Sequence, residues 1–457
     1  MVHKNEFQAV VLAGGKGSRM TELTVGTPKC LLPIANMPMV WYPLKLLEQS
    51  GFAEAIVVVS EAVKTDVTAA LDKCNLNIKP EVVGVLDAED IGTADSLRVI
   101  HDRIKSDLVV VSTDFIANID ISETLNLYRK HNASITALIV QTPKAPEDFV
   151  QPGPKNKQKP ERDLIGIDNE TGRIVFLASA SDFEDNVTMP ARLLKKHSNF
   201  TVFSKLLDAH LYVINKWVLD FLVHNKNFST LKGELLPYIV KKQLEKPKIV
   251  KDDKNASVVK LDTRKDIFRF AVEKPFNESI MRMSAYNDHE TNLNGAYNGD
   301  VIKCYAQIVS GKYGLRANTL QMYYLANALI HDWFELRKEG ELPCSSISPG
   351  ATVKSTQVQN CRIDDNAMVS EKTSLKSSCI GCNVTVEPKT RITKSVIMSN
   401  VTIKQMCVIE NCIICNNCVI NEGSQLKDCI VGANHEVSAN SNHYREILTD
   451  DSRLIEY

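Results

Sequence analysis

The 457-residue chain carries 54 Lys and Arg against 55 Asp and Glu, and 44% of its residues are hydrophobic. This length predicts two or more domains with sizeable cores. A net charge of −1 gives no bulk field that favours nucleic acid or an anionic membrane. No apolar run approaches a membrane span, so we expect neither a membrane nor direct nucleic-acid binding. Because the start has no signal-peptide core, we expect the twelve cysteines to be reduced thiols in the cytosol.

A glycine-rich turn follows the first predicted strand, 7–12. Glycines let the backbone turn tightly, and the amides of such a turn hold phosphate oxygens, while Arg and Lys side chains add positive charge. The candidate phosphate-binding residues are Gly14, Gly15, Gly17, Arg19 and Lys29. The pattern is neither a dinucleotide fingerprint nor an ATPase-type loop, because Met20 replaces the third glycine and no Gly-Lys-Ser/Thr follows. An ordinary strand-to-loop turn remains the alternative.

Strands and helices alternate through the first part of the chain. Predicted strands cover 7–12, 55–59, 81–85, 108–112 and 134–140, and predicted helices cover 39–49, 64–73, 93–104 and 122–130. This alternation predicts a doubly wound, mostly parallel α/β sheet with helices on both faces. Ligands in such folds lie at the carboxyl ends of strands, where the glycine turn and Asp114 both fall. A strand-end aspartate that caps a turn is the alternative for Asp114.

The next part of the chain is less regular. We expect a loop at 151–163, a hairpin at 164–177, a strand at 208–215, polar exposed segments at 245–260 and 278–300, and a helix at 319–338. Gly340 and Pro343 end that helix. The first domain is therefore expected to span 1–340.

A second domain is predicted at 345–440, with a tail at 441–457. Apolar residues recur there at intervals of 6, 6 and 5, which repeat every 17 residues. Three columns result: Ile363, Ile380, Ile397, Ile414 and Val431; Val369, Val386, Ile403, Ile420 and Val437; Leu375, Ile392, Ile409 and Leu426. Three short sides per period predict a triangular coil of stacked rungs. The pattern resembles the hexapeptide repeats of left-handed parallel β-helices, and the handedness is implied by that resemblance alone.

Nine of the cysteines lie between Cys344 and Cys429. Cys379-x-x-Cys382 and the run from Cys412 to Cys418 have spacings compatible with zinc. However, most of the cysteines occupy small positions two residues before the apolar columns, where other rungs have Ser, Thr, Ala or Val. These are Cys361, Cys407, Cys412, Cys418 and Cys429. We therefore favour core packing over zinc and expect no metal.

The extended spacing Gly-Gly-x-Gly-x-Arg, then Pro-Lys and a further Pro, resembles the sugar-phosphate nucleotidyltransferases. These enzymes join a nucleoside triphosphate to a sugar phosphate. The resemblance implies that Gly14, Gly15, Gly17, Arg19 and Lys29 surround the triphosphate. It also implies that Gly92-Thr93-Ala94 contacts the base and that Asp114 is the first of two magnesium-binding aspartates.

Two positions that this family uses for chemistry differ here. The second magnesium ligand belongs to a Trp-x-Asp-x-Gly-Thr stretch, and alignment on Thr319 places Arg316 at that aspartate. An arginine cannot ligate magnesium and would repel it. The sugar-contacting Glu-Lys is missing before 208–212, and Glu273-Lys274 comes too late in the chain. We therefore expect no catalytic residues and no cofactor, only a vestigial nucleotide site.

A degenerate nucleotidyltransferase domain followed by a hexapeptide solenoid resembles the gamma-subunit family of eukaryotic translation initiation factor 2B. The supporting segments are Pro-Lys-Cys-Leu-Leu-Pro at 28–33, Asp-Ala-His-Leu-Tyr at 208–212 and Arg-Ala-Asn-Thr-Leu at 316–320. The epsilon subunit shares this architecture but adds a C-terminal helical domain. Because the sequence ends at Tyr457, soon after the repeats, we expect the gamma type.

The resemblance implies a cytosolic, non-catalytic subunit of a guanine-nucleotide exchange factor. Gamma pairs directly with the epsilon subunit to promote GDP release from initiation factor 2, and contributes scaffolding and substrate docking. Two such pairs join the alpha, beta and delta subunits in a decameric complex.

Two other functions stay open at this point. One is an active pyrophosphorylase that makes a nucleotide-sugar, and the other is a catalytically silent regulatory partner of such an enzyme. A pyrophosphate-exchange assay with sugar 1-phosphates tests the first, and identification of co-purifying proteins tests the second.

Overall fold

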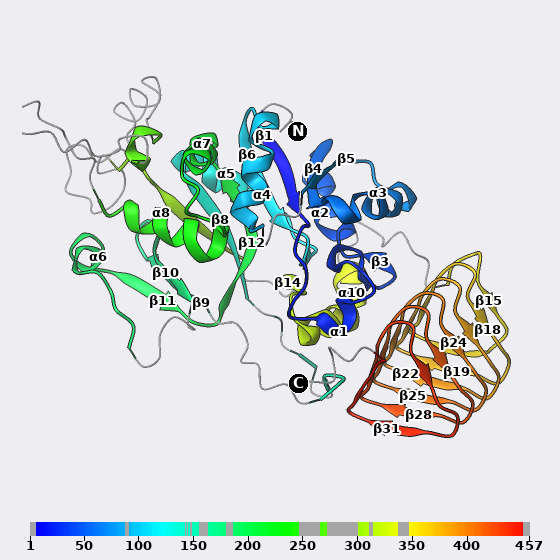
Figure 1. The fold of residues 1–457 in the computed structure, drawn as a ribbon. Coiled ribbons are helices and arrows are strands. Elements are labelled where there is room, and N and C mark those ends of the chain that lie inside the picture. The colour runs from blue at the N-terminus through cyan, green and yellow to red at the C-terminus, as the bar shows by residue number, and fades with distance from the viewer. Residues whose placement is uncertain are drawn as a thin grey trace, which may run out of the picture.

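The structure is a computed structural model that describes residues 6–86, 91–141, 143, 145–146, 149–154, 163–179, 186–245, 266–271, 300–309, 314–336 and 347–450. An α/β domain and a coil of short stacked strands lie side by side (Figure 1). The predicted segments 246–260 and 278–299 lie outside the described residues, as do 155–162, 337–346 and 451–457.

A seven-stranded sheet forms the centre of the first domain, in the order β13-β8-β12-β6-β1-β4-β5. Its strands are β1 (Phe7–Leu12), β4 (Glu54–Ser60), β5 (Lys79–Val85), β6 (Asp107–Ser112), β8 (Ile135–Gln141), β12 (Leu206–Ile214) and β13 (Cys304–Val309). Strand β12 runs antiparallel to β6 and β8, and the other four neighbouring pairs are parallel. The predicted mostly parallel sheet is confirmed.

Helices cover both faces of this sheet. Successive side chains of a strand point to opposite faces, so Val10 and Leu12 join one hydrophobic cluster while Ala9 and Val11 join the other. The first cluster includes side chains of α4 (Thr93–Val99), α7 (Lys216–His224) and α8 (Leu236–Lys242). The second includes side chains of α2 (Trp41–Gln49), α3 (Lys64–Lys73) and α5 (Ser122–His131).

Several elements differ from the prediction. The helix expected at 93–104 ends at Val99 and is followed by a 3-10 turn, His101–Arg103. The expected hairpin is present as β9 (Asp163–Asp168) and β10 (Ile174–Ser179), with β11 (Phe200–Phe203) pairing on its other side. Strands β7 (Phe115–Ala117) and β14 (Gly314–Arg316) were not predicted, because three residues are too few to show a period of two.

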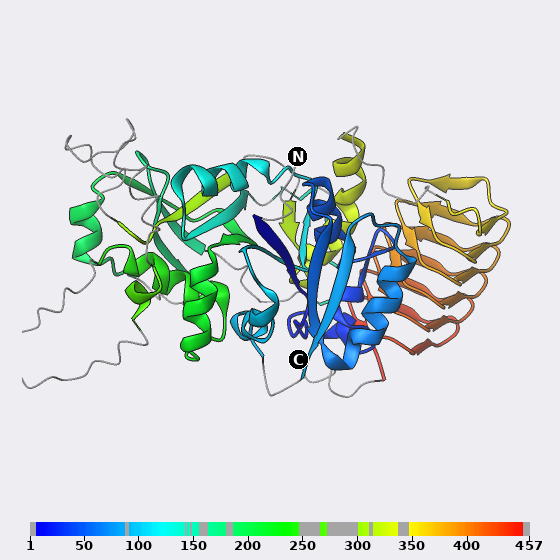
Figure 2. The same cartoon turned by 90° about the horizontal axis from the view of Figure 1, so that it is seen from above.

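The second domain is a left-handed parallel β-helix made of three six-stranded parallel sheets. Each strand pairs with the strand 17 residues further on, as in Ile380 with Ile397 and Ile403 with Ile420. All fourteen residues of the three predicted columns are buried in one cluster. The interval of 6, 6 and 5 residues and the three-sided coil are therefore confirmed. Figure 2 shows the rungs of the coil stacked in a row.

The corners of the coil contain residues with a left-handed backbone. These residues repeat at the same 6, 6 and 5 intervals, and asparagine, which tolerates this conformation, occupies many of them. At one corner Asn383, Asn400, Asn417 and Asn434 form a ladder, in which each side-chain amide donates to the oxygen of the next at 3.0–3.1 Å. The predicted columns contain only apolar residues, so this polar ladder was not predicted.

The coil extends past residue 440, where we placed its end. Strands β31 (Asn442–Tyr444) and β32 (Ile447–Leu448) pair with the preceding rung, so part of the expected tail belongs to the coil. In this last rung His443 occupies the column that Leu426 fills one turn earlier, which ends the apolar stripe with a polar side chain. The domain limits 1–340 and 345–440 otherwise remain predictions.

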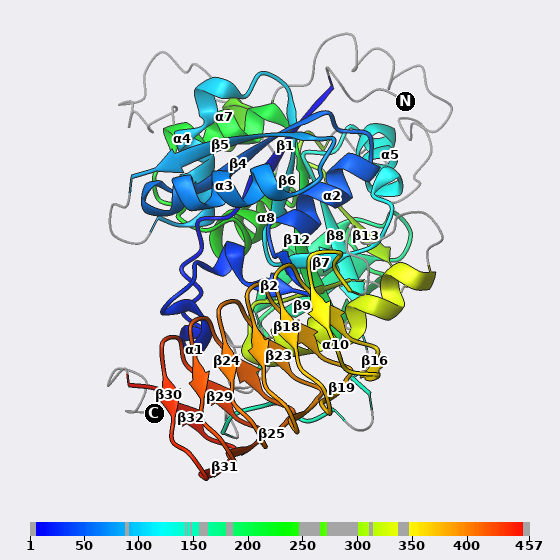
Figure 3. The same ribbon diagram turned by 90° about the vertical axis from the view of Figure 1, so that its right-hand side faces the viewer.

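One sheet of the coil faces the first domain. Its strands β23 (Val396–Ile397), β26 (Ile413–Ile414) and β29 (Ile430–Val431) turn Val396, Ile413 and Ile430 outward into a cluster shared with α10 (Leu320–Leu336) and the segment 20–42. Asn36 Nδ2 donates to the carbonyl oxygen of Ile380 at 2.9 Å, and Asn416 Nδ2 donates to Thr27 Oγ1 at 2.8 Å. Figure 3 shows α1 (Thr21–Thr24) and α10 at this junction.

The cysteine pattern follows from these two sides of the coil. The five cysteines that were assigned to small inward positions are buried in the coil, in agreement with the prediction. Cys379 and Cys415 lie on the opposite side of their strands, and Cys415 packs in the cluster between the domains. Among the described residues no group of three His, Cys, Asp or Glu has a geometry that would hold a metal ion.

None of the helices in the described part of the chain combines the length and the apolar character needed to span a bilayer.

Candidate functional site

The glycine turn begins where β1 ends. Gly17 has a φ of +74°, and a Cβ there would lie 2.7 Å from Cγ2 of Thr24, so both backbone and packing require glycine. A Cβ at Gly15 would meet no heavy atom within 4 Å, so packing does not require glycine there. Gly14, Gly15 and Arg19 are exposed. Of the three glycines, only Gly17 is therefore required by backbone conformation and packing, and the role of the turn in phosphate binding stays a prediction.

Three charged residues meet at the carboxyl end of β6. Lys29 Nζ lies 2.7 Å from Asp114 Oδ2. Arg316 donates to both oxygens of the same carboxylate, from Nε to Oδ1 at 3.2 Å and from Nη2 to Oδ2 at 3.0 Å. Asp114 is 1% exposed and Arg316 is 9% exposed. This ion cluster, Lys29, Asp114 and Arg316, is a bidentate arginine–carboxylate pair with a second cation.

The backbone around β7 and β14 fixes this arrangement. Arg316 pairs with Phe115 in the antiparallel ladder between the two strands, which places it beside Asp114. The N–H of Ala317 donates to the carbonyl oxygen of Asp114 at 2.8 Å. Because a ladder holds Arg316 in place, its contact with Asp114 does not depend on a flexible loop.

The ion cluster does not fit a divalent cation. Burial alone would raise the pKa of Asp114, but the charges of Arg316 and Lys29 outweigh it and hold the pKa well below its usual range. The carboxylate is therefore ionised, and both of its oxygens already accept hydrogen bonds from cations. A magnesium ion needs several oxygen ligands and would be repelled by the guanidinium. Arg316 supplies the positive charge at this carboxylate instead of a metal.

The segment that the resemblance assigns to base contact, Gly92–Ala94, is covered by another part of the chain, the segment 229–231. The N–H of Ala94 donates to the carbonyl oxygen of Ser229 at 2.8 Å, and Thr93 Oγ1 accepts from the N–H of Leu231 at 2.8 Å. A Cβ at Gly92 would lie 2.1 Å from the Ser229 carbonyl oxygen. Gly92 thus allows the close approach of 229–231, whose backbone already binds the Ala94 N–H and the Thr93 hydroxyl.

A second polar cluster was not predicted as part of the site. Strand β12 has an irregular register between Asp208 and Tyr212, and His210 between them has a φ of +52°. Asp208 accepts from the N–H of His210 at 2.8 Å and from the Tyr212 hydroxyl at 2.6 Å. Burial, followed by the charge of Arg316, holds the pKa of His210 well below its usual range, so its imidazole is neutral.

Asp208 lies two residues before His210, and Tyr212 lies two residues after it. An aspartate two residues before a residue with a left-handed backbone is a turn signal within an otherwise apolar strand. That signal was present in the sequence. The two segments weighed for the sugar-contacting Glu-Lys pair, 180–183 and Glu273-Lys274, lie outside the described residues.

Comparisons with known proteins agree with this two-domain arrangement. A family model described as a nucleotidyl transferase matches residues 8–149, and one described as the GMPPB C-terminal domain matches residues 357–447. The chain is 30% identical over 376 residues to the translation initiation factor eIF2B subunit gamma of Schizosaccharomyces pombe. The aligned region covers 81% of this chain and 74% of that protein.

Two further relatives belong to the same group of translation factors. The eIF2B subunit gamma of Caenorhabditis elegans is 31% identical over 300 residues, covering 64% of this chain and 73% of that protein. The eIF2B subunit epsilon of S. pombe is 24% identical over 242 residues, covering 51% of this chain and 34% of that protein.

Proposed function

The chain belongs to the family of eIF2B gamma subunits, and we propose that it acts as the gamma subunit of a guanine-nucleotide exchange complex. In this proposal the chain binds the epsilon subunit directly and joins the alpha, beta and delta subunits in a decameric complex in the cytosol. The gamma–epsilon pair promotes GDP release from initiation factor 2. The chain itself contributes scaffolding and substrate docking and transfers no nucleotidyl group.

The observation that carries the non-catalytic role is the contact between Arg316 and Asp114. Metal-assisted transfer to a sugar phosphate needs cations that bridge the phosphates and the protein carboxylates. Here the buried carboxylate is bound by a guanidinium that the β7–β14 ladder holds in place. Arg316 lies at the position where the resemblance implies a second carboxylate, and this supports the proposal that the site lacks the ligand set for that chemistry.

The start of α4 supports the same proposal independently. In this proposal a base would have to displace the segment 229–231 from Gly92–Ala94, where that segment makes one hydrogen bond to the Ala94 N–H and one to the Thr93 hydroxyl. Displacement would leave those polar groups unpaired unless the ligand replaced every contact. The contacts of Arg316 with Asp114 and of 229–231 with the start of α4 both support a nucleotide site that is only vestigial.

The scaffolding role is supported by the way in which the two domains are joined. The segment 20–42 lies directly after the glycine turn and packs with α10 against the coil. Apolar side chains of both domains form the cluster between them, for example Leu23 of the first domain and Ile413 of the coil. Burial of this kind fixes the relative position of the two domains and lets the other two sheets of the coil face outward.

Reconstitution tests the proposed exchange function. The rate of GDP release from initiation factor 2 is measured with the epsilon subunit alone and with epsilon plus this chain. We expect the pair to co-purify and to release GDP faster than epsilon alone. A chain that neither binds epsilon nor changes the rate would contradict the proposal. Identification of proteins that co-purify with the endogenous chain tests the decameric complex, because alpha, beta and delta should be present.

A further inference from the structure

Strand β11 is an edge of a three-stranded sheet, here called the small sheet, whose order is β10-β9-β11. The N–H of Asn169 donates to the carbonyl oxygen of Asn199 at 3.1 Å, directly before the ladder of β9 and β11. Because hydrogen-bonded positions alternate in an antiparallel ladder, Phe200 and Val202 turn their N–H and C=O groups away from β9. No other described strand pairs with β11, so these groups can accept a further strand.

The two faces of the small sheet differ in what covers them. Ile165 and Ile167 of β9 turn into the core of the domain. Gly166 between them faces the opposite way, and its partners in the neighbouring strands are Phe176 and Val202. Val202 is 39% exposed, and neither Phe176 nor Val202 belongs to a hydrophobic cluster of the described residues. The outer face therefore carries an apolar strip next to the open edge.

The chain around β11 is basic. Between residues 186 and 207 the sequence has four Lys and Arg residues and no Asp or Glu. Arg192, Lys195 and Lys205 are exposed, and in the part of the chain that the structure describes they have no ion-pair partner. Glu170, in the turn between β9 and β10, is an exposed acidic residue of the same sheet. The excess of positive charge beside β11 favours an acidic partner.

The basic segment is anchored to the domain. Helix α6 (Ala191–Lys196) precedes β11 and buries Leu193 completely. Lys196 Nζ lies 2.6 Å from Asp300 Oδ1 and donates to the carbonyl oxygen of Gln243 at 2.9 Å. Helix α6 and β11 lie at the end of the molecule away from the coil (Figure 1). Because these elements are already fixed, little ordering is needed when a strand binds.

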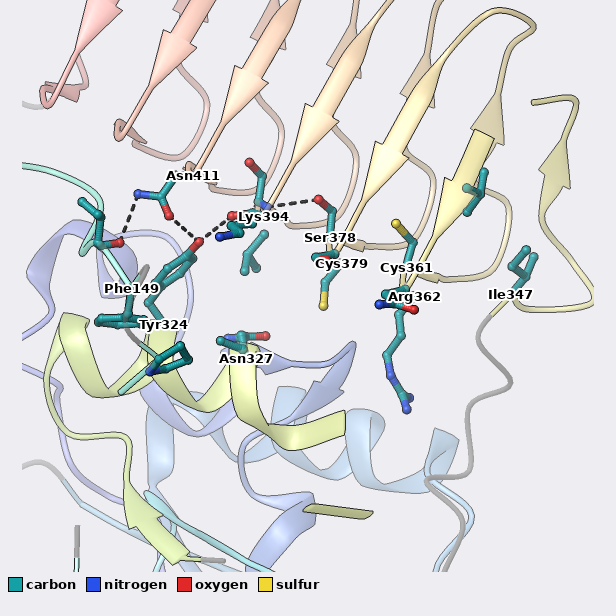
Figure 4. A pocket seen from close by; sticks show the side chains of 18 residues that line it. Phe149, Tyr324, Asn327, Ile347, Cys361, Arg362, Ser378, Cys379, Lys394 and Asn411 are labelled. Atoms are coloured by element: carbon teal, nitrogen blue, oxygen red, sulfur yellow. Dashed lines mark hydrogen bonds between the residues drawn. The ribbon is translucent and has the colours of Figure 1, made fainter. Parts of the chain in front are cut away.

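The junction between the two domains differs from this surface. Several polar groups that line its cavity bind one another (Figure 4). The Tyr324 hydroxyl lies 2.6 Å from Asn411 Oδ1, and Asn411 Nδ2 donates to the Val150 carbonyl oxygen at 3.0 Å. Ser378 Oγ accepts from the N–H of Ser395 at 3.1 Å. The unpaired backbone groups of β11 therefore favour that edge over the junction as a docking surface.

We propose that β11 binds an extended acidic segment of a partner protein, which adds a fourth strand to the small sheet. The main chain of that segment pairs with the N–H and C=O groups of Phe200 and Val202. Its apolar side chains pack beside Phe176 and Val202, and its carboxylates lie near Lys195 and Lys205. This docking surface shares no residue with the ion cluster and does not depend on the exchange function.

Fluorescence anisotropy on the full chain tests this surface with a labelled octapeptide that alternates glutamate and valine. A peptide with lysine in place of glutamate tests the charge, and an N-methylated version of the glutamate peptide tests the main-chain pairing. We expect both to bind at least about 10-fold more weakly than the glutamate peptide. Hydrogen exchange of the amides in 198–205 should also slow when the glutamate peptide is bound.

Charge reversal locates the binding. The double variant Lys195→Glu, Lys205→Glu should bind the glutamate peptide about 10-fold more weakly and the lysine peptide more tightly than the wild type does. The matched control is Lys73→Glu, Lys79→Glu, because these exposed lysines belong to α3 and β5 at the other end of the large sheet. Since β5 is also an edge strand, the control shows which of the two edges the peptide uses.

A proline tests the edge itself. Val202→Pro removes an N–H that points away from β9, a position where an edge strand tolerates proline. We expect binding of the glutamate peptide to weaken about 10-fold. Val202→Thr keeps the N–H and the β-branched shape and is the matched control. Thermal melts show whether each variant folds, and the N-methylated peptide carries the test if Val202→Pro does not.

The outcomes separate the possible occupants of the edge. Weaker binding in the Lys195, Lys205 variant, with the β5 control unchanged, supports the proposal. Equal binding of the glutamate and lysine peptides, loss of binding in the β5 control alone, or no binding at all would overturn it. Dimerisation that Val202→Pro abolishes would assign the edge to a second copy of the chain instead. Binding that appears only after Asp182, Glu184 and Asp185 are replaced by Asn and Gln would assign it to the chain's own acidic segment and would also overturn the proposal.

Discussion

The coil and the ion cluster are both buried, yet they are built on different principles. Each rung of the coil repeats the contacts of its neighbours, so Ile380, Ile397 and Ile414 occupy equivalent positions. The ion cluster occurs once, and its three residues come from positions 29, 114 and 316. Because its contacts repeat, the coil can be predicted from the sequence. It also tolerates a polar residue at one of the inward positions that small side chains occupy. The ion cluster has no such redundancy, so one substitution decides what the site can do.

The largest effect is expected within the coil. Ile397→Asp removes an apolar contact in the middle of a five-member column and buries a carboxylate without a partner. The free energy of unfolding should fall by more than about 3 kcal/mol. Thermal melts measure it, with Ile397→Val as the control, expected to cost about 1 kcal/mol. Similar melts for the two variants would contradict the inward position of this column.

Replacing the guanidinium tests the ion cluster. Arg316→Met leaves Asp114 with Lys29 as its remaining cationic partner in the ion cluster, so we expect a loss of about 2–3 kcal/mol at neutral pH. Arg316→Lys keeps the charge but not the two-bond geometry and should lose less. Chemical denaturation measures both variants.

The pH dependence of this loss has a definite sign. The pKa of Asp114 is lowered in the folded protein, so its contribution to stability is present above the unfolded pKa and is lost as the pH falls through the folded pKa. The stability difference between the wild type and Arg316→Met should therefore shrink below about pH 4. A difference that stays constant from pH 7 to pH 3 would show that the charge of Asp114 does not matter.

The glycine turn allows a matched pair of substitutions. Gly17→Val forces a β-branched residue into a left-handed backbone and a Cβ within 2.7 Å of Thr24, so it should cost about 2 kcal/mol. Gly15→Ala meets no neighbour and should be close to neutral. Calorimetry with GTP and magnesium completes the test. Tight, magnesium-dependent binding to the wild type would contradict a vestigial turn.

The smallest effect is expected for Cys412→Ser. Cys412 Sγ donates to the carbonyl oxygen of Glu410 and lies 3.4 Å from the N–H of Cys429. Ser395, one rung earlier, makes the same two contacts with its hydroxyl. We expect a change below about 1 kcal/mol, far less than for Ile397→Asp. Metal analysis gives an independent test, because stoichiometric zinc that is lost in Cys412→Ser would show that this thiol is a ligand.

Periodicity explains what was predictable. The columns of the coil and the alternation of strands and helices around β1 depend on local spacing, and both were confirmed. Strands β7 and β14 were missed because three residues carry no period, although they hold Arg316 beside Asp114. The contact of 229–231 with the start of α4 joins segments more than 130 residues apart, and no local pattern indicates it.

The identity of the site residues was predictable in part. Resemblance to a family placed Asp114 and Arg316 at metal positions, but it could not show that the two side chains would bind each other. The sequence also offered no reason to expect Lys29 to bind Asp114 rather than to remain open to a phosphate. Both contacts arise because opposite charges brought together by the backbone pair once water is excluded.

A pyrophosphate-exchange assay tests the central claim most directly. The full chain is incubated with magnesium, GTP and mannose 1-phosphate, then with other triphosphates and sugar 1-phosphates, beside the Asp114→Ala variant. Because Arg316 binds the carboxylate that a metal would need, we expect no exchange above background in either protein. Turnover by the wild type that Asp114→Ala abolishes would show that the site is catalytic and would contradict the account.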